Sequence, residues 1–182
     1  MPQHELILGV TAGIAAYKAA FLASKLVQSG VQVTVVMTPA AEAFIGAATF
    51  AALTSRPVAR EVFDPAYPLG AHIELAERAK LLVVAPATAD FMAKAANGLA
   101  DDLLSTLYLS FTGTVLMAPA MNCEMWEKPA VQRNVTQLQA DGVQFIGPEE
   151  GWLSCRKRGA GRMADPEKIL AAIQAIIMDA KN

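Results

Sequence analysis

Residues 6–18 read LILGVTAGIAAYK, and this run points to the fold class of the whole chain. An apolar, β-rich segment, Leu6–Val10, leads through small residues into a helical pattern that extends to about Gln28. A strand that turns into a helix in this way brings backbone N–H groups and the positive end of the helix together. The turn is therefore a candidate phosphate site, although small residues also pack in ordinary α/β turns.

The same alternation of β-rich and helical patterns continues to the end of the chain. Further β-rich runs are Val31–Met37, Leu81–Ala85, Thr114–Met117 and Val143–Ile146, and helical patterns cover about Gly13–Gln28, Ala89–Ala96, Asp101–Ser110, Pro129–Ala140 and the residues from Pro166 onward. The β-rich runs are nearly all apolar rather than alternating, as expected of parallel strands covered on both faces. We therefore predict an α/β fold of the Rossmann-like type, with a doubly wound, mostly parallel sheet and helices on both faces.

Composition narrows the classes of function. The 182 residues fit one domain, 1–182, and 54 % are hydrophobic against 18 % charged, which indicates a doubly covered sheet and buried subunit contacts. A net charge of −2 argues against a nucleic-acid partner, and no apolar run approaches the ~20 residues that cross a membrane. The N-terminus lacks the features of a signal peptide, and Cys123 and Cys155 form neither a disulfide framework nor a metal-ligand cluster. We expect a cytoplasmic protein with reduced thiols and no metal.

The loops after the predicted strands favour a mononucleotide over a dinucleotide. The fingerprint G-x-G-x-x-G is absent, and the second strand runs into Thr38 and Ala40 without the acidic residue that holds an adenosine ribose. A hydroxyl at Thr38, facing the first loop, suits the phosphate or the ribityl chain of a mononucleotide. The third and fourth strands also end in small or hydroxyl-bearing loops, 85–91 and 117–122, at the edge where open α/β sheets bind ligands.

Residues 147–165 differ from the rest of the chain. They contain glycines, an isolated Trp152 and the basic cluster Arg156–Arg158, but no hydrophobic periodicity. We predict a long loop here, and long loops in compact domains are often functional.

Four segments in order resemble the homo-oligomeric flavin-containing cysteine decarboxylases, and specifically their phosphopantothenoylcysteine decarboxylase branch. The segments are 9–18, 85–106, 119–126 and 153–163, and the resemblance extends over nearly the whole chain. The most specific is PAMNCEMW at 119–126, which matches the family pattern P-x-M-N-x-x-M-W. One such motif could match by chance, but all four in order could not.

The resemblance implies a cofactor, a reaction and an assembly. The implied reaction is the FMN-dependent decarboxylation of the small molecule 4'-phosphopantothenoylcysteine to 4'-phosphopantetheine, a carboxy-lyase step of coenzyme A biosynthesis. In this family the flavin oxidises the thiol-bearing carbon, the C=S group accepts electrons as carbon dioxide leaves, and the reduced flavin returns them. A homotrimer or a dodecamer, with FMN near subunit contacts, is also implied. FMN is expected to lie against Ala12, Gly13, Ile14, Thr38, Ala40, Thr88, Ala89, Asp90, Phe91 and Ala120.

The same resemblance implies the catalytic and substrate-binding residues. His72, in GAHIEL at 70–75, is the expected acid/base of the oxidative half, and Cys155 is the expected donor of the proton that completes reduction. Asn122 and Met125 are expected to hold the carboxylate end of the substrate, and Met163 to lie near the substrate. Taken alone, a histidine at a helix start is more often a surface residue, a lone cysteine an inert small hydrophobe, and such an asparagine a helix N-cap.

One departure from the family pattern concerns the loop that carries Cys155. The family usually has Ala-Cys-Gly where this chain has Ser154-Cys155-Arg156. Glycine reaches a positive φ easily and arginine does not, so we expect a stiffer or redirected loop. The basic residues 156–158 are expected to point partly away from the thiol, because nearby cations would favour a thiolate that has no proton to donate.

Three other functions stay open on the same fold. A peptidyl-cysteine decarboxylase would share the flavin site and His72 but need a different loop, and the Cys155 segment with Met163 favours the pantothenoyl substrate. A flavin prenyltransferase would lack the arrangement at 119–126 and the loop cysteine. The joint presence of His72, Asn122 and Cys155 argues against a non-catalytic flavin-binding regulatory subunit.

Overall fold

Five parallel strands form the central sheet of the computed structural model, which describes residues 5–179. The strands are β1 (Glu5–Val10), β2 (Gln32–Met37), β3 (Ala79–Ala87), β4 (Thr114–Pro119) and β5 (Gln144–Phe145), in the spatial order β2-β1-β3-β4-β5. The register pairs Leu8 with Val35 on one side and with Val83 on the other. The chain therefore winds outward in both directions from the boundary between β1 and β3, which confirms the predicted doubly wound sheet.

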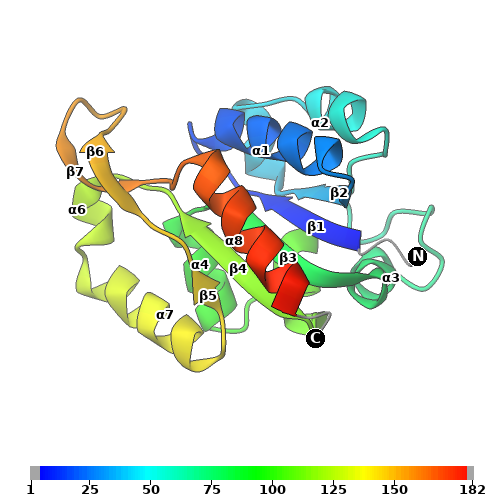
Figure 1. Cartoon of the computed structure of the whole chain (residues 1–182). Helices are drawn as coiled ribbons and strands as arrows, with labels where there is room; N and C mark the ends of the chain where they lie inside the picture. Colours follow the sequence, from blue (N-terminus) through cyan, green and yellow to red (C-terminus); the bar gives the residue numbers. More distant parts are fainter. Residues whose placement is uncertain (1–4, 180–182) are drawn as a thin grey trace.

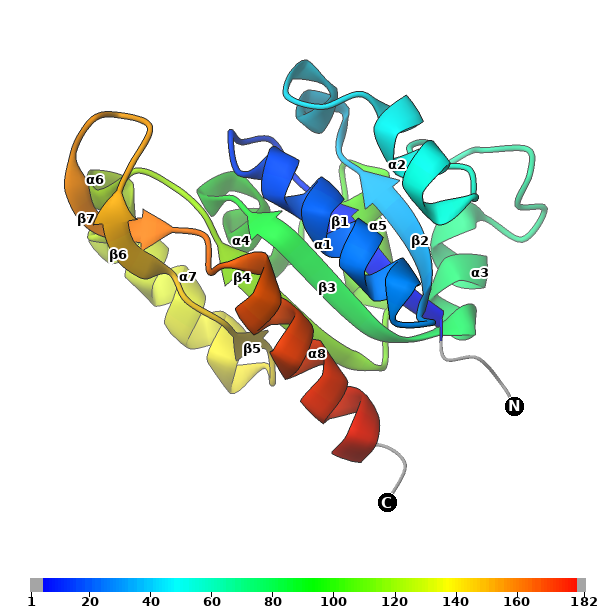
Figure 2. The same ribbon diagram turned by 45° about the horizontal axis from the view of Figure 1, so that its top comes forward.

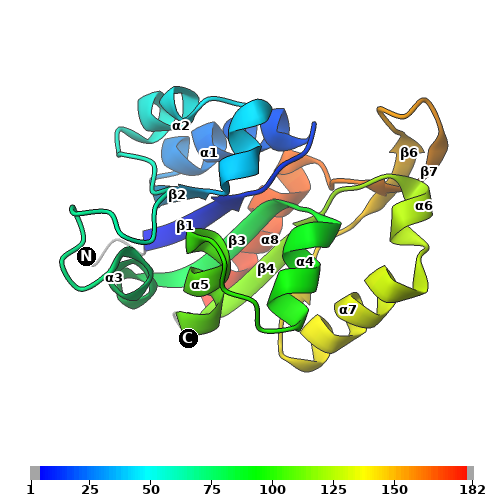
Figure 3. The same cartoon turned by 180° about the vertical axis from the view of Figure 1, so that it is seen from behind.

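Helices cover both faces of the sheet, as predicted. One face carries α1 (Ala16–Gln28), α2 (Ala47–Thr54) and α8 (Pro166–Asp179), and Figure 1 shows α1 and α8 lying across it. The other face, seen from behind in Figure 3, carries α3 (Ala71–Arg78), α4 (Ala89–Ala96), α5 (Leu103–Ser110) and α7 (Pro129–Ala140). Leu6 and Leu8 pack into the first core and Ile7 into the second, so burial on both faces accounts for the uninterrupted apolar runs.

Several element boundaries differ from the prediction. The helix expected from Gly13 begins at Ala16, because Gly13–Ala15 form the turn itself, where the Ala16 N–H donates to the Gly13 carbonyl at 2.9 Å. The helix expected from Asp101 begins at Leu103, since Asp102 is its N-cap and forms a capping box with Ser105. The structure also contains the short helices α2, α3 and α6 (Cys123–Trp126) and the 3-10 turn η1 (Pro39–Ala43), for which no residue range was predicted.

The long loop predicted for residues 147–165 is wrong over most of its length. Residues 149–162 form an antiparallel hairpin of β6 (Glu149–Trp152) and β7 (Arg158–Arg162), in which Trp152 pairs with Arg158. Figure 2 shows this hairpin beside α6 at one end of the molecule and α3 at the opposite end. The hairpin packs against α6 rather than in a continuous core, so its strands need no alternating apolar pattern.

Within residues 5–179, no helix has both the length and the apolar character that a membrane crossing requires.

Candidate active site

A cavity of about 900 Å³ lies at the carboxyl ends of β1, β2, β3 and β4. Its walls are the loops that follow these strands, the start of α6, the tip of the hairpin and the end of β7. This is the edge at which doubly wound sheets bind ligands, and the volume suits a cofactor together with a small substrate. All the residues expected to contact FMN line this cavity: Ala12, Gly13, Ile14, Thr38, Ala40, Thr88, Ala89, Asp90, Phe91 and Ala120.

The turn before α1 has the features of an anion site. Ala15 is the N-cap of α1 and supplies no side-chain hydrogen bond to the first turn. Gly13 and Thr38 face the same cavity, and the Thr38 hydroxyl makes no capping bond to the helical turn that it precedes. An uncapped helix N-terminus of this length attracts a negatively charged group, and a nearby hydroxyl can donate to it.

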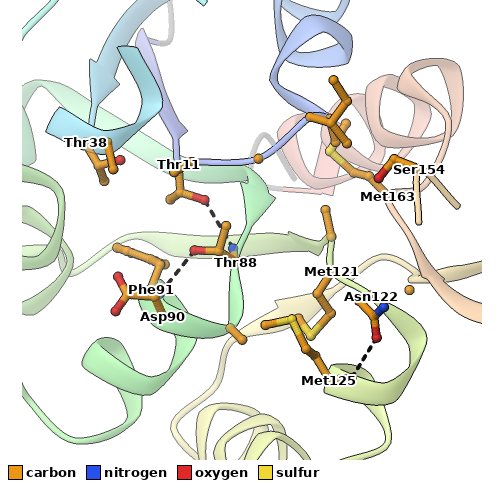
Figure 4. A pocket seen from close by; sticks show the side chains of 18 of the residues that line it. Thr11, Thr38, Thr88, Asp90, Phe91, Met121, Asn122, Met125, Ser154 and Met163 are labelled. Carbon is orange, nitrogen blue, oxygen red and sulfur yellow. Dashed lines mark hydrogen bonds between the residues drawn. The ribbon is translucent and has the colours of Figure 1, made fainter. Parts of the chain in front are cut away.

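Thr11 joins the first and third loops of the cavity. Its side chain is buried, and Oγ1 donates to the Pro86 carbonyl at 2.7 Å while accepting from the Thr88 N–H at 3.2 Å. The Thr88 hydroxyl in turn accepts from the Phe91 N–H at 3.3 Å and caps α4 (Figure 4). This chain of bonds fixes the spacing of the two loops, which the separate sequence motifs do not reveal.

Lys94 gathers three carboxylates on another wall of the cavity. Its Nζ lies 3.1 Å from Asp101, 3.3 Å from Asp90 and 3.9 Å from Asp102. Desolvation opposes the charge on Lys94, but hydrogen bonds to Asp101 and Asp90 outweigh it and raise the pKa of the ammonium. The hydrogen bond from Lys94 lowers the pKa of Asp101. Lys94 and Asp101 therefore stay charged at neutral pH, and their pairing ties α4 to the residues that precede α5.

Asn122 lines the cavity with its amide already oriented. Its Oδ1 accepts from the N–H of Glu124 at 2.7 Å and of Met125 at 3.3 Å, so it caps α6 (Figure 4). With the oxygen turned to the backbone, the amide nitrogen is the end that can donate to a ligand. Met125 and Asn122 both line the cavity, so the N-cap and ligand-binding interpretations of Asn122 are compatible.

The hairpin supplies the wall opposite the nucleotide loops. Cys155 at its tip is exposed and lines the cavity, as does buried Met163 just after β7. Lys18 on α1 secures this end, because its Nζ donates to the Met163 carbonyl at 3.2 Å and to Asp165 at 3.0 Å. The hydrogen bond from Lys18 lowers the pKa of Asp165, which favours the ionised carboxylate.

Arg156 adopts a positive φ of 63° at the hairpin tip. This left-handed conformation favours glycine over other residues. The stiffer or redirected loop expected from arginine stays a prediction. The side chains of residues 156–158 lie outside the cavity lining, as expected, and Lys157 pairs with Glu124 instead.

His72 does not reach this cavity within one chain. It lies in the first turn of α3, where its carbonyl accepts from Ser110 at 3.4 Å, at the C-terminal end of α5. Asp102 caps the other end of α5 and lines the cavity, and eight helical residues span about 12 Å. Figures 1 and 3 place α3 and the hairpin at opposite ends of the molecule. The His72 Nδ1 atom is buried and has no hydrogen-bond partner among residues 5–179.

Several lining residues were not expected from the sequence. Thr11 lies in the loop that follows the first strand. Its hydroxyl, placed directly after an apolar strand, is the feature of the sequence that could have identified it. Met121 belongs to the motif at 119–126 and Trp152 to the unusual segment 147–165, although neither was assigned to the site. Lys18, Lys94 and Arg162 reach the cavity through packing between distant segments.

Comparison with known proteins places the chain in a family. The family model described as Flavoprotein matches residues 1–178. The chain is 47 % identical over 168 residues to the coenzyme A biosynthesis bifunctional protein CoaBC of Bacillus subtilis (strain 168), covering 92 % of this chain and 41 % of that protein. The chain thus spans less than half the length of this curated relative.

Two solved structures extend the comparison. The FMN-dependent cysteine decarboxylase SpaF has a TM-score of 0.86 and 35 % identity, over 100 % of this chain and 99 % of that chain. A cysteine-to-serine variant of PPC decarboxylase, complexed with pantothenoylaminoethenethiol, has a TM-score of 0.89 and 26 % identity, over 97 % of this chain and 99 % of that chain. The chain belongs to the flavoprotein family.

Proposed function

We propose that the chain is a decarboxylase that uses FMN to convert 4'-phosphopantothenoylcysteine into 4'-phosphopantetheine in coenzyme A biosynthesis. The observation that carries the proposal is that Asn122, Cys155 and Met163 meet the nucleotide loops around a single cavity. The similarity to the coenzyme A biosynthesis protein CoaBC and to PPC decarboxylase supports this substrate. In the net reaction the substrate loses one carbon dioxide and takes up one proton, so no external electron acceptor is needed.

The residues around the cavity fit FMN. The uncapped start of α1 beside Gly13 suits the phosphate, and the hydroxyls of Thr38 and Thr88 suit the phosphate or the ribityl chain. Phe91 and Met121 provide apolar surface for a ring system. When bound, FMN supplies a two-electron oxidation of the substrate and the matching reduction.

Asn122 binds the carboxylate that is lost. Its amide donates a neutral hydrogen bond, because its oxygen is held by the backbone of Glu124 and Met125. A neutral donor stabilises the ground-state carboxylate less than an arginine would, which leaves less stabilisation to lose as carbon dioxide departs.

Cys155 donates the proton that completes the reaction. Loss of carbon dioxide leaves an enethiolate whose carbon must be protonated, and the Cys155 thiol at the cavity wall is a suitable acid. Because Cys155 is exposed, it can recover a proton from water. The solved PPC decarboxylase variant lacks a cysteine and binds pantothenoylaminoethenethiol, an enethiol without a carboxyl group, which supports a cysteine in this late step.

A second copy of the chain supplies His72. His72 lies too far from the cavity of its own chain to act there, so its proposed acid/base role requires a neighbour. Exposed apolar side chains occur on both surfaces that would meet, with Phe63 and Leu69 close to His72 in the chain and Tyr17 and Trp152 at the cavity. Two different surfaces in contact make a heterologous interface, which closes into a ring such as the proposed trimer.

The test is carbon dioxide release by the purified protein loaded with FMN and supplied with synthetic 4'-phosphopantothenoylcysteine. Wild-type protein should release carbon dioxide and form 4'-phosphopantetheine in equal amounts. His72→Asn should stop before carbon dioxide release, whereas Cys155→Ser should release carbon dioxide without forming 4'-phosphopantetheine. Failure to bind FMN, or normal 4'-phosphopantetheine formation by both variants, would contradict the proposal.

The second candidate is a peptidyl-cysteine decarboxylase, favoured by the 35 % identity to the cysteine decarboxylase SpaF. A peptide with a C-terminal cysteine, tested beside 4'-phosphopantothenoylcysteine, separates the two. Faster carbon dioxide release from the peptide would assign this second function.

A further inference from the structure

The inner strand of the hairpin is docked on the segment that carries Asn122. The Met121 N–H donates to the Gly161 carbonyl at 2.9 Å. A Cβ at Gly159 would lie 2.8 Å from the Cys123 Cβ, and one at Gly161 would meet the Met121 carbonyl. Only glycine permits this approach, so β7 is held in a fixed position relative to Asn122.

The base of the hairpin is held by ion pairs. Arg162 bonds to Glu149 at 2.8 Å, and Lys168 on α8 bonds to the same carboxylate at 2.6 Å. The hydrogen bond from Lys168, with a further one from Arg162, lowers the pKa of Glu149. Lys18 holds the chain that follows β7 through Asp165. Among the described residues, the tip at 153–157 has no ion pair of this kind to α1 or α8.

At the tip, Leu153 is buried, and Lys157 forms an ion pair with Glu124 on α6. Within the tip, the Arg156 N–H donates to the Leu153 carbonyl at 2.8 Å and the Leu153 N–H to the Lys157 carbonyl at 2.9 Å. Cys155 lies between these bonds and lines the cavity, whereas Lys157 pairs with exposed Glu124 on α6, outside the cavity lining. The hydrogen bond between Lys157 and Glu124 lowers the pKa of the carboxyl and raises that of the ammonium, so both are charged at neutral pH.

We propose that Glu124 and Lys157 are positioning residues, which hold the hairpin tip and its Cys155 thiol against the segment that carries Asn122. Glu124 stands two residues after Asn122, so one short helix would orient the group that binds the carboxylate and the group that donates the proton. The proposal rests on the proposed role of Cys155. Both partners are exposed, and such pairs change an equilibrium by roughly two- to five-fold.

The experiment uses the FMN-loaded protein and four variants. Glu124→Gln and Lys157→Met each break the pair, and the exchange Glu124→Lys with Lys157→Glu restores it in reverse. Glu42→Gln is the matched control, because it breaks the exposed Arg60–Glu42 pair at 2.8 Å, whose partners lie outside the cavity lining. Hydrogen–deuterium exchange over residues 153–158 reports the tip, and single-turnover assays report carbon dioxide release and 4'-phosphopantetheine formation separately.

Glu124→Gln and Lys157→Met should each speed hydrogen–deuterium exchange at the tip by about two- to five-fold and slow 4'-phosphopantetheine formation by a similar factor. Carbon dioxide release should stay unchanged in both. The charge exchange should restore both measurements. A salt concentration of about 0.5 M should loosen the wild-type tip but have little effect on Glu124→Gln, because salt screens only an existing pair.

The proposal would be overturned if Glu124→Gln left the hydrogen–deuterium exchange rate of residues 153–158 unchanged, or if Glu42→Gln changed that rate as much as Glu124→Gln does. The proposal would also be overturned if the double variant Glu124→Lys with Lys157→Glu did not return the hydrogen–deuterium exchange rate of the tip to its wild-type value. Hydrogen–deuterium exchange is measured without turnover. It therefore tests the positioning of the tip separately from the role of Cys155, which the Cys155→Ser assay tests.

Discussion

Thr11 fixes the distance between two loops that are far apart in the sequence. Its hydroxyl bonds to the carbonyl of Pro86 and the N–H of Thr88, and all three groups lie at or beside the cavity. A buried residue placed so close to the expected phosphate and ribityl groups affects both stability and ligand binding.

Replacement of Thr11 by Val should therefore weaken the fold and FMN binding together. The side chain keeps its shape, but the Pro86 carbonyl and the Thr88 N–H lose their partner, at a cost of about 1–3 kcal/mol in the free energy of unfolding. Denaturant unfolding and FMN titration measure the two effects. Thr11→Ser keeps the hydroxyl and serves as the control, and equal stability of the Val and Ser variants would contradict this assignment.

At Arg156 the backbone conformation matters more than the type of side chain. An L-residue at a φ of 63° costs roughly 1–2 kcal/mol relative to glycine, and the structure nevertheless keeps this angle. Arg156→Gly should relieve the strain and slow hydrogen exchange at the tip, whereas Arg156→Ala loses the same charge but keeps the strain. The comparison of these two variants isolates the backbone effect, and identical exchange rates would show that no strain is present.

At the scale of elements, the contact between β7 and α6 connects the two groups that handle the substrate. Gly161 has a φ of 142° and its backbone approaches Met121 too closely for any side chain. The nucleotide loops follow β1, β2 and β3, on other walls of the cavity. Changes at this contact should therefore weaken substrate binding more than they weaken cofactor binding, to which Met121 contributes only part of the apolar surface.

Gly161→Ala should push β7 away from α6 and disturb Asn122. We expect a loss of about 1–3 kcal/mol in unfolding free energy and a marked rise in KM, with a smaller change in the Kd for FMN. Gly46→Ala is the control, because Gly46 has open space around it and a φ of −75°, so it should change little. An equal loss of FMN and substrate affinity in Gly161→Ala would argue against this division of the cavity.

At the scale of the whole molecule, the separation of His72 from the cavity makes catalysis a property of the assembly. A site in the proposed ring combines the pocket of one copy with His72 of another. Two inactive variants that fail for different reasons can then complement each other, which a monomeric site does not allow.

A mixture of His72→Asn and Cys155→Ser chains, unfolded and reassembled together, should regain activity. With equal amounts and random assembly, about a quarter of the sites pair an intact Cys155 pocket with an intact His72, so about a quarter of the wild-type rate is expected. Each variant assembled alone is the control, with light scattering to confirm the assembly. No recovery in well-formed mixed assemblies would show that both residues act in the same copy.

The sequence by itself determined the sheet, the two helical layers and the loops of the nucleotide cavity. Runs such as Leu6–Val10 are apolar throughout because parallel strands are buried on both faces, and the loops after them meet because parallel strands end at one edge. The tertiary structure alone decided the hairpin at 149–162, the distance of His72 from the cavity and the pair between Lys157 and Glu124. These features arise from contacts between segments distant in the chain, to which periodicity and local propensity, as properties of neighbouring residues, are insensitive.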